Sequence, residues 1–193
     1  MRTYIGFFIA SVFGTVTVLG GCSNASTSKA PEAPSPLSFP PYAGPATQLF
    51  DDRIDPMAVG LAGVTENPRL DQTLKARTQK AEVAGRMRVS TVTVDSVGGR
   101  PVYRLRFTLS EAPVVARGFN GNQIEVALTD DSPAFAIVKW LDTKLIGYSF
   151  VGFFHRFAGS YEPQIRFHLS PDDPQVLSAV RDASALSELT NPR

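Results

Sequence analysis

Few side chains in this 193-residue chain are of the types that carry out catalysis. The sequence holds no Gly-x-Ser-x-Gly elbow, no His-Glu-x-x-His pair and no phosphate-binding glycine loop. Its two histidines, His155 and His168, lie in segments that we expect to be strands, where a packed or hydrogen-bonded imidazole is the usual role. Two histidines on neighbouring strands are too few ligands for a metal ion. We therefore predict no metal site, no cofactor and no catalytic residue, and we favour a non-enzymatic protein.

Arginine is the residue type with the clearest grouping. Arg104 and Arg106 alternate along the polar face of one predicted strand, and Arg156 and Arg166 lie in a predicted hairpin further along the chain. Arginine forks bind carboxylates and other anions, so these four residues are candidates for an anion-binding site. The alternative is that carboxylates of the same chain neutralise them, with these candidates: Glu125, Glu162, Asp182 and Glu188.

The single cysteine, Cys22, directly follows an apolar segment at the N-terminus. Arg2 precedes 18 uncharged residues, from Tyr4 to Gly21, which is the basic and then apolar arrangement of a secretory signal peptide. An uncleaved membrane anchor is the alternative, because about 18 apolar residues are just enough to span a bilayer. A free structural cysteine is the remaining alternative.

The segment Leu19-Gly20-Gly21-Cys22 resembles the lipobox of bacterial lipoproteins, with a branched residue, two small residues and a cysteine. The resemblance implies that the chain is cut before Cys22 and that its thiol carries a diacylglyceryl group, which with further acylation gives durable membrane attachment. Ser23 in the next position resembles the outer-membrane sorting choice of these proteins. We therefore expect a lipid-anchored protein of the cell envelope, at the outer membrane and facing the periplasm. The resemblance covers 22 residues and implies no activity for the rest.

Composition divides the remainder into a tether and one domain. Without the signal peptide, residues 1–21, the chain has 18 basic and 18 acidic residues, which gives no electrostatic case for nucleic acid or an anionic membrane surface as partner. Residues 22–48 are rich in Pro, Ser and Ala, which predicts a disordered tether. Residues 49–193 are enough for a single globular domain with a sizeable core. This domain has no cysteine, so packing alone must stabilise it.

The most informative pattern in the domain is a predicted β-hairpin. Val102–Leu109 alternates between apolar and polar residues, and a two-residue turn at Gly98-Gly99 would pair this strand with the preceding one. Val94 would then lie opposite Tyr103, so that the apolar sets of both strands coincide. The apolar residues before Ser90 fall on the other parity, which predicts a β-bulge near that residue.

A second hairpin is predicted within Ser149–Leu169. Its first strand has phenylalanines on both faces, so we expect it to be covered on both sides. A pairing of Phe157 with Ile165 would set Arg156 directly opposite Arg166. Like charges across a ladder are unfavourable unless a carboxylate or an anion lies between them.

Three helices are predicted from their capping residues, after Asn67, after Ser132 and after Ser170–Asp173. With a further strand at Gln123–Thr129, the order is three strands, a helix and two strands, with flanking helices. This order resembles the OB-fold, a five-stranded barrel with a helix between strands three and four. We therefore expect an α+β domain that is mainly β and OB-like, although a fold implies no function by itself.

These features favour a lipid-anchored envelope lipoprotein whose domain is a non-enzymatic binding or scaffold module. The expected partners are the membrane, through lipid on Cys22, and an envelope protein or glycan, and not nucleic acid. An envelope hydrolase and a pilotin-like assembly helper are the alternatives.

Overall fold

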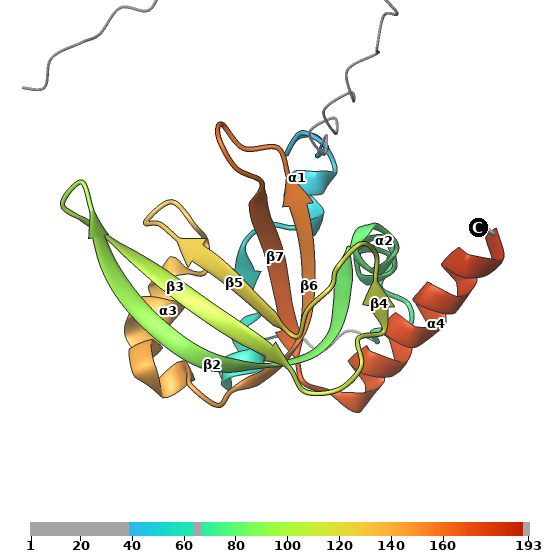
Figure 1. The fold of residues 1–193 in the computed structure, drawn as a ribbon. Coiled ribbons are helices and arrows are strands. Elements are labelled where there is room, and N and C mark those ends of the chain that lie inside the picture. The colour runs from blue at the N-terminus through green and yellow to red at the C-terminus, as the bar shows by residue number, and fades with distance from the viewer. Residues whose placement is uncertain (1–38, 64–66, 191–193) are drawn as a thin grey trace, which may run out of the picture. The chain divides into compact units, whose positions relative to one another are not determined.

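The computed structural model describes residues 39–63 and 67–190 (Figure 1). The predicted signal peptide, the lipobox with Cys22 and the tether up to residue 38 lie outside these ranges. None of the helices within the two ranges has both the length and the apolar character needed to cross a bilayer.

The described part of the chain is α+β and mainly β, as predicted, with seven strands and four α-helices. Two 3-10 helices, η1 and η2, complete the elements. In chain order they are α1 (Ala46–Leu49), β1 (Arg53–Ile54), η1 (Pro56–Val59), α2 (Gln72–Lys80), β2 (Val83–Val97), β3 (Arg100–Leu109), β4 (Val115–Ala116), β5 (Gln123–Leu128), α3 (Phe135–Leu141), η2 (Asp142–Leu145), β6 (Ser149–Phe157), β7 (Gln164–Pro171) and α4 (Pro174–Thr190).

All seven strands join one mixed sheet in the order β1-β7-β6-β2-β3-β5, with β4 paired to β2. Only the pair β1–β7 is parallel. The order of three long strands, a helix and two strands is present as β2, β3, β5, α3, β6 and β7. The sheet is nevertheless open, because no ladder among the described strands joins β5 to β7 or β1. The closed five-stranded barrel expected from the sequence is therefore not observed.

The first hairpin has the predicted register. Val94 lies opposite Tyr103 and Val92 lies opposite Leu105 in the β2–β3 ladder. The turn residues Gly98-Gly99 have φ angles of 60° and 80°, which a two-residue turn of this kind requires and which residues with a Cβ rarely adopt. Turn chemistry and apolar alternation thus specify the same pairing.

The predicted β-bulge is also present in β2. The ladder shifts between Val89 and Thr91, so that Ser90 has no partner in register and its Oγ donates to the Arg106 carbonyl at 3.0 Å. The N-terminal part of β2 pairs with β6 and the rest pairs mainly with β3, so the bulge lies where this long strand bends (Figure 1). The bend allows this one strand to pair with β6 in its first part and with β3 in the rest.

Strand β6 separates two hydrophobic clusters, as the phenylalanines on both of its faces predicted. Phe150 and Phe154 belong to the cluster that includes α3, η2, β3 and β5. Phe153 and Phe157 belong to the cluster that includes α1, α2 and α4. The helices thus cover both faces of this strand, and both faces are buried.

Two of the three predicted helix starts are wrong by a few residues. Helix α2 begins after Asp71, whose Oδ1 accepts the N–H groups of Thr73 and Leu74 at 2.7 and 3.1 Å. The predicted cap Asn67 instead forms a turn, in which its side chain accepts the Arg69 N–H. The third start, before α4, is confirmed: Asp173 accepts the N–H of the second helical residue at 2.6 Å.

Helix α3 begins at Phe135 rather than directly after Ser132. The Ser132 hydroxyl instead accepts the Thr129 N–H at 3.3 Å, and no side-chain hydrogen bond caps the start of α3. At its other end the helix stops at Leu141, because Asp142 has a φ of 47°. The shorter η2 continues from there.

Candidate functional site

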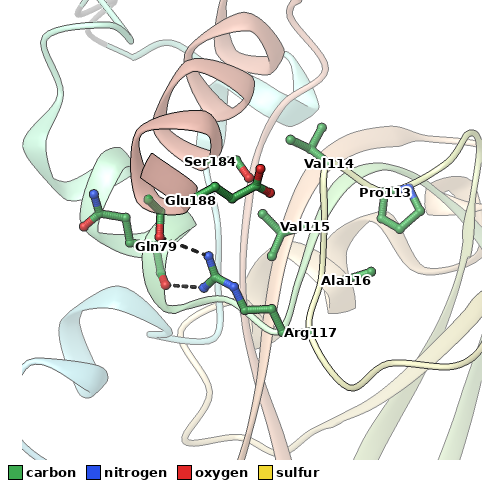
Figure 2. A pocket seen from close by; sticks show the side chains of 9 residues that line it. Gln79, Pro113, Val114, Val115, Ala116, Arg117, Ser184 and Glu188 are labelled. Atoms are coloured by element: carbon green, nitrogen blue, oxygen red, sulfur yellow. Dashed lines mark hydrogen bonds between the residues drawn. The ribbon is translucent and has the colours of Figure 1, made fainter. Parts of the chain in front are cut away.

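A groove of about 790 Å³ lies between the C-terminal parts of α2 and α4 and the strand β4 (Figure 2). We call it the α2–β4–α4 groove. It is open to solvent and has both polar and apolar walls, as its lining residues show: Gln79, Pro113, Val114, Val115, Ala116, Arg117, Ser184, Ser187 and Glu188. Such a lining suits an extended polar chain better than a small apolar molecule.

Strand β4 is an edge strand that borders this groove. On one side it pairs with β2, and the Arg117 N–H that follows it donates to the Glu82 carbonyl at 2.6 Å. Because backbone groups alternate along a strand, the N–H and C=O of Ala116 point away from β2. An edge with free backbone groups can pair with a further extended chain.

Two residues fix the position of β4. A Cβ atom on Gly85 of β2 would lie 3.2 Å from Cα of Pro113, so a larger residue here would press the segment before β4 outward by a few tenths of an ångström. At the other end, the Arg117 guanidinium points toward α2 and α4 (Figure 2) and donates to the carbonyls of Gln79 and Ala81 and to Ser187 Oγ. A cation at these carbonyls satisfies acceptors that the C-terminus of α2 leaves unpaired.

The predicted arginine site is neutralised at its first pair. Arg104 Nε lies 2.6 Å from Asp95 Oδ2, and Arg106 Nη2 lies 2.9 Å from Glu125 Oε2. Glu125 also lies 3.7 Å from Arg104. The outer face of β2, β3 and β5 is therefore a ladder of ion pairs, with Glu125 as one of the predicted counter-ions.

The second arginine pair does not form as predicted, because the β6–β7 register differs by one residue. Arg156 lies opposite Ile165, and Arg166 lies opposite His155. The two arginines consequently lie on opposite faces of the hairpin. Arg156 Nε contacts Glu82 Oε2 at 2.5 Å, and Arg166 donates to Asp52. The structure thus does not bring the four arginines together, and each contacts a carboxylate.

Both histidines are held against carboxylates and largely enclosed. His168 Nδ1 lies 2.8 Å from Asp51 Oδ1, and His155 Nδ1 lies 3.2 Å from Glu82 Oε1 while its ring stacks on Phe157. Burial lowers the pKa of both imidazoles, against the opposing effect of the carboxylates. Burial also acts to raise the pKa of Asp51, but the hydrogen bond with His168 and nearby cations bring it below its usual value. A neutral His168 that donates to an ionised Asp51 fits these directions.

Residues 39–55 contact the strands β6 and β7, with β1 lying parallel to β7, and we call them the N-terminal strap. The Pro40 carbonyl accepts the Ala158 N–H at 2.9 Å, and the Tyr42 ring lies 5.1 Å from the Phe157 ring, centroid to centroid. The Asp55 N–H donates to the Leu169 carbonyl at 2.8 Å. Residues 39–48, which the sequence assigns to the tether, therefore contact the domain.

Asp52 is the central fastening of this strap. The residue is 6% exposed, and its carboxylate accepts hydrogen bonds from the Arg166 guanidinium and from the Phe167 N–H. Its backbone N–H donates to the Phe167 carbonyl, and its carbonyl accepts the Ala134 N–H at the start of α3. Its φ of 50° is uncommon for a residue with a side chain. Burial raises the pKa of Asp52, which Arg166 and the Phe167 N–H only partly offset.

No protein-family model, no curated protein and no solved structure matches the chain. Among the described residues, no group of three or more His, Cys, Asp and Glu side chains converges as a metal site would require.

The sequence predicted neither the N-terminal strap nor the α2–β4–α4 groove. Asp51 and Asp52 follow Leu49 and Phe50 as an acidic pair after two apolar residues, which was a usable sign of a structural role. The groove left no such sign, because its lining comes from three segments far apart in the chain.

Proposed function

We propose that this chain is a lipid-anchored lipoprotein of the cell envelope whose folded domain is a non-enzymatic binding module. Its binding site is the α2–β4–α4 groove, and its ligand is an extended segment of an envelope protein. The observation that carries this proposal is the free edge of β4 inside a groove of about 790 Å³. The strand order around α3 supports an OB-like description of the fold as part of the same proposal.

An extended peptide suits this groove for a specific reason. The backbone groups of Ala116 offer the hydrogen bonds by which a chain adds to a sheet edge, while the walls from α2 and α4 can contact its side chains. The groove has charges of both signs, Arg117 and Glu188, which is unlike the aromatic platforms that bind glycans or nucleic acid. A protein segment is therefore the ligand that we favour over a glycan.

An envelope hydrolase is less well supported. His155 and His168 are the only histidines of the chain, and each is enclosed and held against a carboxylate of the strap or of the start of β2. Both lie outside the lining of the groove. The arrangement suits a role in fastening the strap to β6 and β7.

The anchor is tested by following the N-terminus of the chain. We expect the exported protein to lack residues 1–21 and to incorporate labelled palmitate on Cys22, because the lipobox requires the thiol for both steps. A Cys22→Ser variant should keep residues 1–21 and take up no label. Intact mass and label uptake measure both effects. Wild-type protein that retains residues 1–21 and takes up no label would contradict the lipid anchor and would instead indicate an uncleaved membrane anchor.

The groove is tested by site-specific photo-crosslinking in the envelope. A photoreactive residue at Glu188 in the groove should give one polypeptide adduct, whereas the same residue at exposed Ser96 on β2 should give none. The further substitution Ala116→Pro should reduce the adduct about tenfold, because proline removes the outward N–H at an edge position without breaking the ladder to β2. Its thermal midpoint should match that of the parent. Equal adducts at Glu188 and Ser96, or a saccharide adduct, would contradict the proposal.

A further inference from the structure

A second surface feature surrounds the break between α3 and η2, away from β4 and α4 at the other side of the sheet (Figure 1). Trp140 is 65% exposed and Ile146 is 48% exposed, although both are large and apolar. Lys139 and Lys144 are exposed in the same short segment. Trp140 is also the only tryptophan of the chain.

The buried residues of this segment define which way it faces. Val138, Leu141 and Leu145 are almost fully buried in the cluster beneath the sheet. Because these side chains point inward, the exposed side chains between them must point outward, to solvent. Backbone hydrogen bonds from Gly147 to Val89 and from Val89 to Tyr148, each of 2.9 Å, hold the end of the segment against β2. The exposed side chains are therefore carried on a fixed backbone.

A third cation joins this surface from β2. A Cβ atom on Gly147 would lie 3.3 Å from Arg88 Nη2, so the guanidinium of this exposed arginine lies beside the segment. We call the five outward residues the α3–η2 patch: Arg88, Lys139, Trp140, Lys144 and Ile146. The segment contributes one acidic residue, the exposed Asp142.

The cations of this patch have no carboxylate partner, unlike most other cations in the described part of the chain. Nine arginines there lie within 4 Å of a carboxylate. None of the ion pairs among the described residues includes Arg88, Lys139 or Lys144. Three cations without a carboxylate partner among the described residues thus lie in or beside the segment that carries an exposed tryptophan.

We infer that the α3–η2 patch is a membrane-contact surface that binds anionic phospholipid headgroups. Tryptophan prefers the boundary between headgroups and acyl chains, where its ring is buried and its N–H stays hydrated. Lysine and arginine without internal partners attract the anionic headgroups on either side. The near-zero net charge of the whole chain does not predict such a contact, because the acidic residues that balance these cations lie elsewhere in the chain. This inference is independent of the ligand in the α2–β4–α4 groove.

The test uses Trp140 as its own probe. The full-length purified chain is reconstituted into vesicles that carry brominated acyl chains, with either phosphatidylcholine alone or an added third of phosphatidylglycerol. The N-terminal anchor of the proposed function attaches it to both vesicles, whether by lipid or by apolar residues, so quenching of Trp140 reports only contact of the patch. We expect quenching to be about fivefold greater in the anionic vesicles and to decline in high salt.

Matched charge reversals complete the experiment. Lys139→Glu with Lys144→Glu should reduce quenching to the level of the neutral vesicles. Lys75→Glu with Lys80→Glu makes the same change of charge at two α2 lysines that also have no carboxylate partner among the described residues, and it should leave quenching unchanged. Equal quenching in both vesicles, or an equal loss in both variants, would overturn the inference. Shielding of Trp140 by soluble envelope glycans in place of lipid would also overturn it.

Discussion

Replacement of Asp52 by alanine is expected to lower the free energy of unfolding by about 3 kcal/mol, because it leaves the Arg166 guanidinium and the Phe167 N–H without their buried acceptor. The value lies at the lower end for a broken buried ion pair, since Arg166 is partly exposed and can turn toward water. Urea denaturation followed by circular dichroism measures the change. The strap should also become more susceptible to proteolysis near Phe50, because Asp52 is its central fastening.

Three related substitutions separate the contributions at this position. Asp52→Gly should be more stable than Asp52→Ala by about 1 kcal/mol, since glycine adopts a φ of 50° without strain. Asp52→Asn keeps an acceptor for the Phe167 N–H and a residue that tolerates positive φ, so it should be the least destabilising of the three Asp52 variants. Arg166→Met removes the partner charge and leaves the Asp52 carboxylate in place. If Asp52→Ala and wild type unfold at the same urea concentration, the strap is not held by this side chain.

The local features of the fold followed from the sequence. In the first hairpin the Gly98-Gly99 turn and the alternation of Val102–Leu109 each specify the same register, so the pairing of Val94 with Tyr103 was predicted correctly. The bulge near Ser90 followed from the same parity argument. These features depend on residues that are close in the chain, for which turn chemistry and alternation are sufficient.

The β6–β7 register could not be obtained in this way. Both faces of β6 are apolar, with Phe150 and Phe154 on one side and Phe153 and Phe157 on the other. A shift of one residue therefore exchanges one apolar face for another, and alternation does not oppose it. The predicted register placed Arg156 opposite Arg166, whereas the structure places Arg156 opposite Ile165 and Arg166 opposite His155.

The strap and the candidate sites depend on contacts between distant segments. Strand β1 has two residues and no periodicity, and it exists because Asp52 and Asp55 bond to β7 more than 100 residues later. The α2–β4–α4 groove likewise requires three separate segments. The α3–η2 patch could not be predicted for another reason. The sequence gives only the net charge of the whole chain, whereas the structure shows which cations have a carboxylate partner and which do not.

Truncation of either central phenylalanine of β6 should lower the free energy of unfolding at least as much as Asp52→Ala. Phe153 is 0% exposed in one cluster and Phe154 is 2% exposed in the other. Each change to alanine removes a fully buried ring and leaves a cavity, for which the expected loss is about 3 to 5 kcal/mol of unfolding free energy. Urea denaturation of the purified domain variants measures both losses.

The comparison of the two variants tests the architecture itself. In a sheet with one solvated face, one of two successive residues can be truncated at little cost, as we expect for Val94→Ala, where the side chain is 50% exposed. In this protein helices α2 and α4 cover the Phe153 face, and α3 with β3 and β5 covers the Phe154 face. Phe153→Ala and Phe154→Ala should therefore cost similar amounts. A loss below about 1 kcal/mol for Phe153→Ala would mean that α2 and α4 do not pack on β6 as described, and the groove that they form with β4 would lose its support.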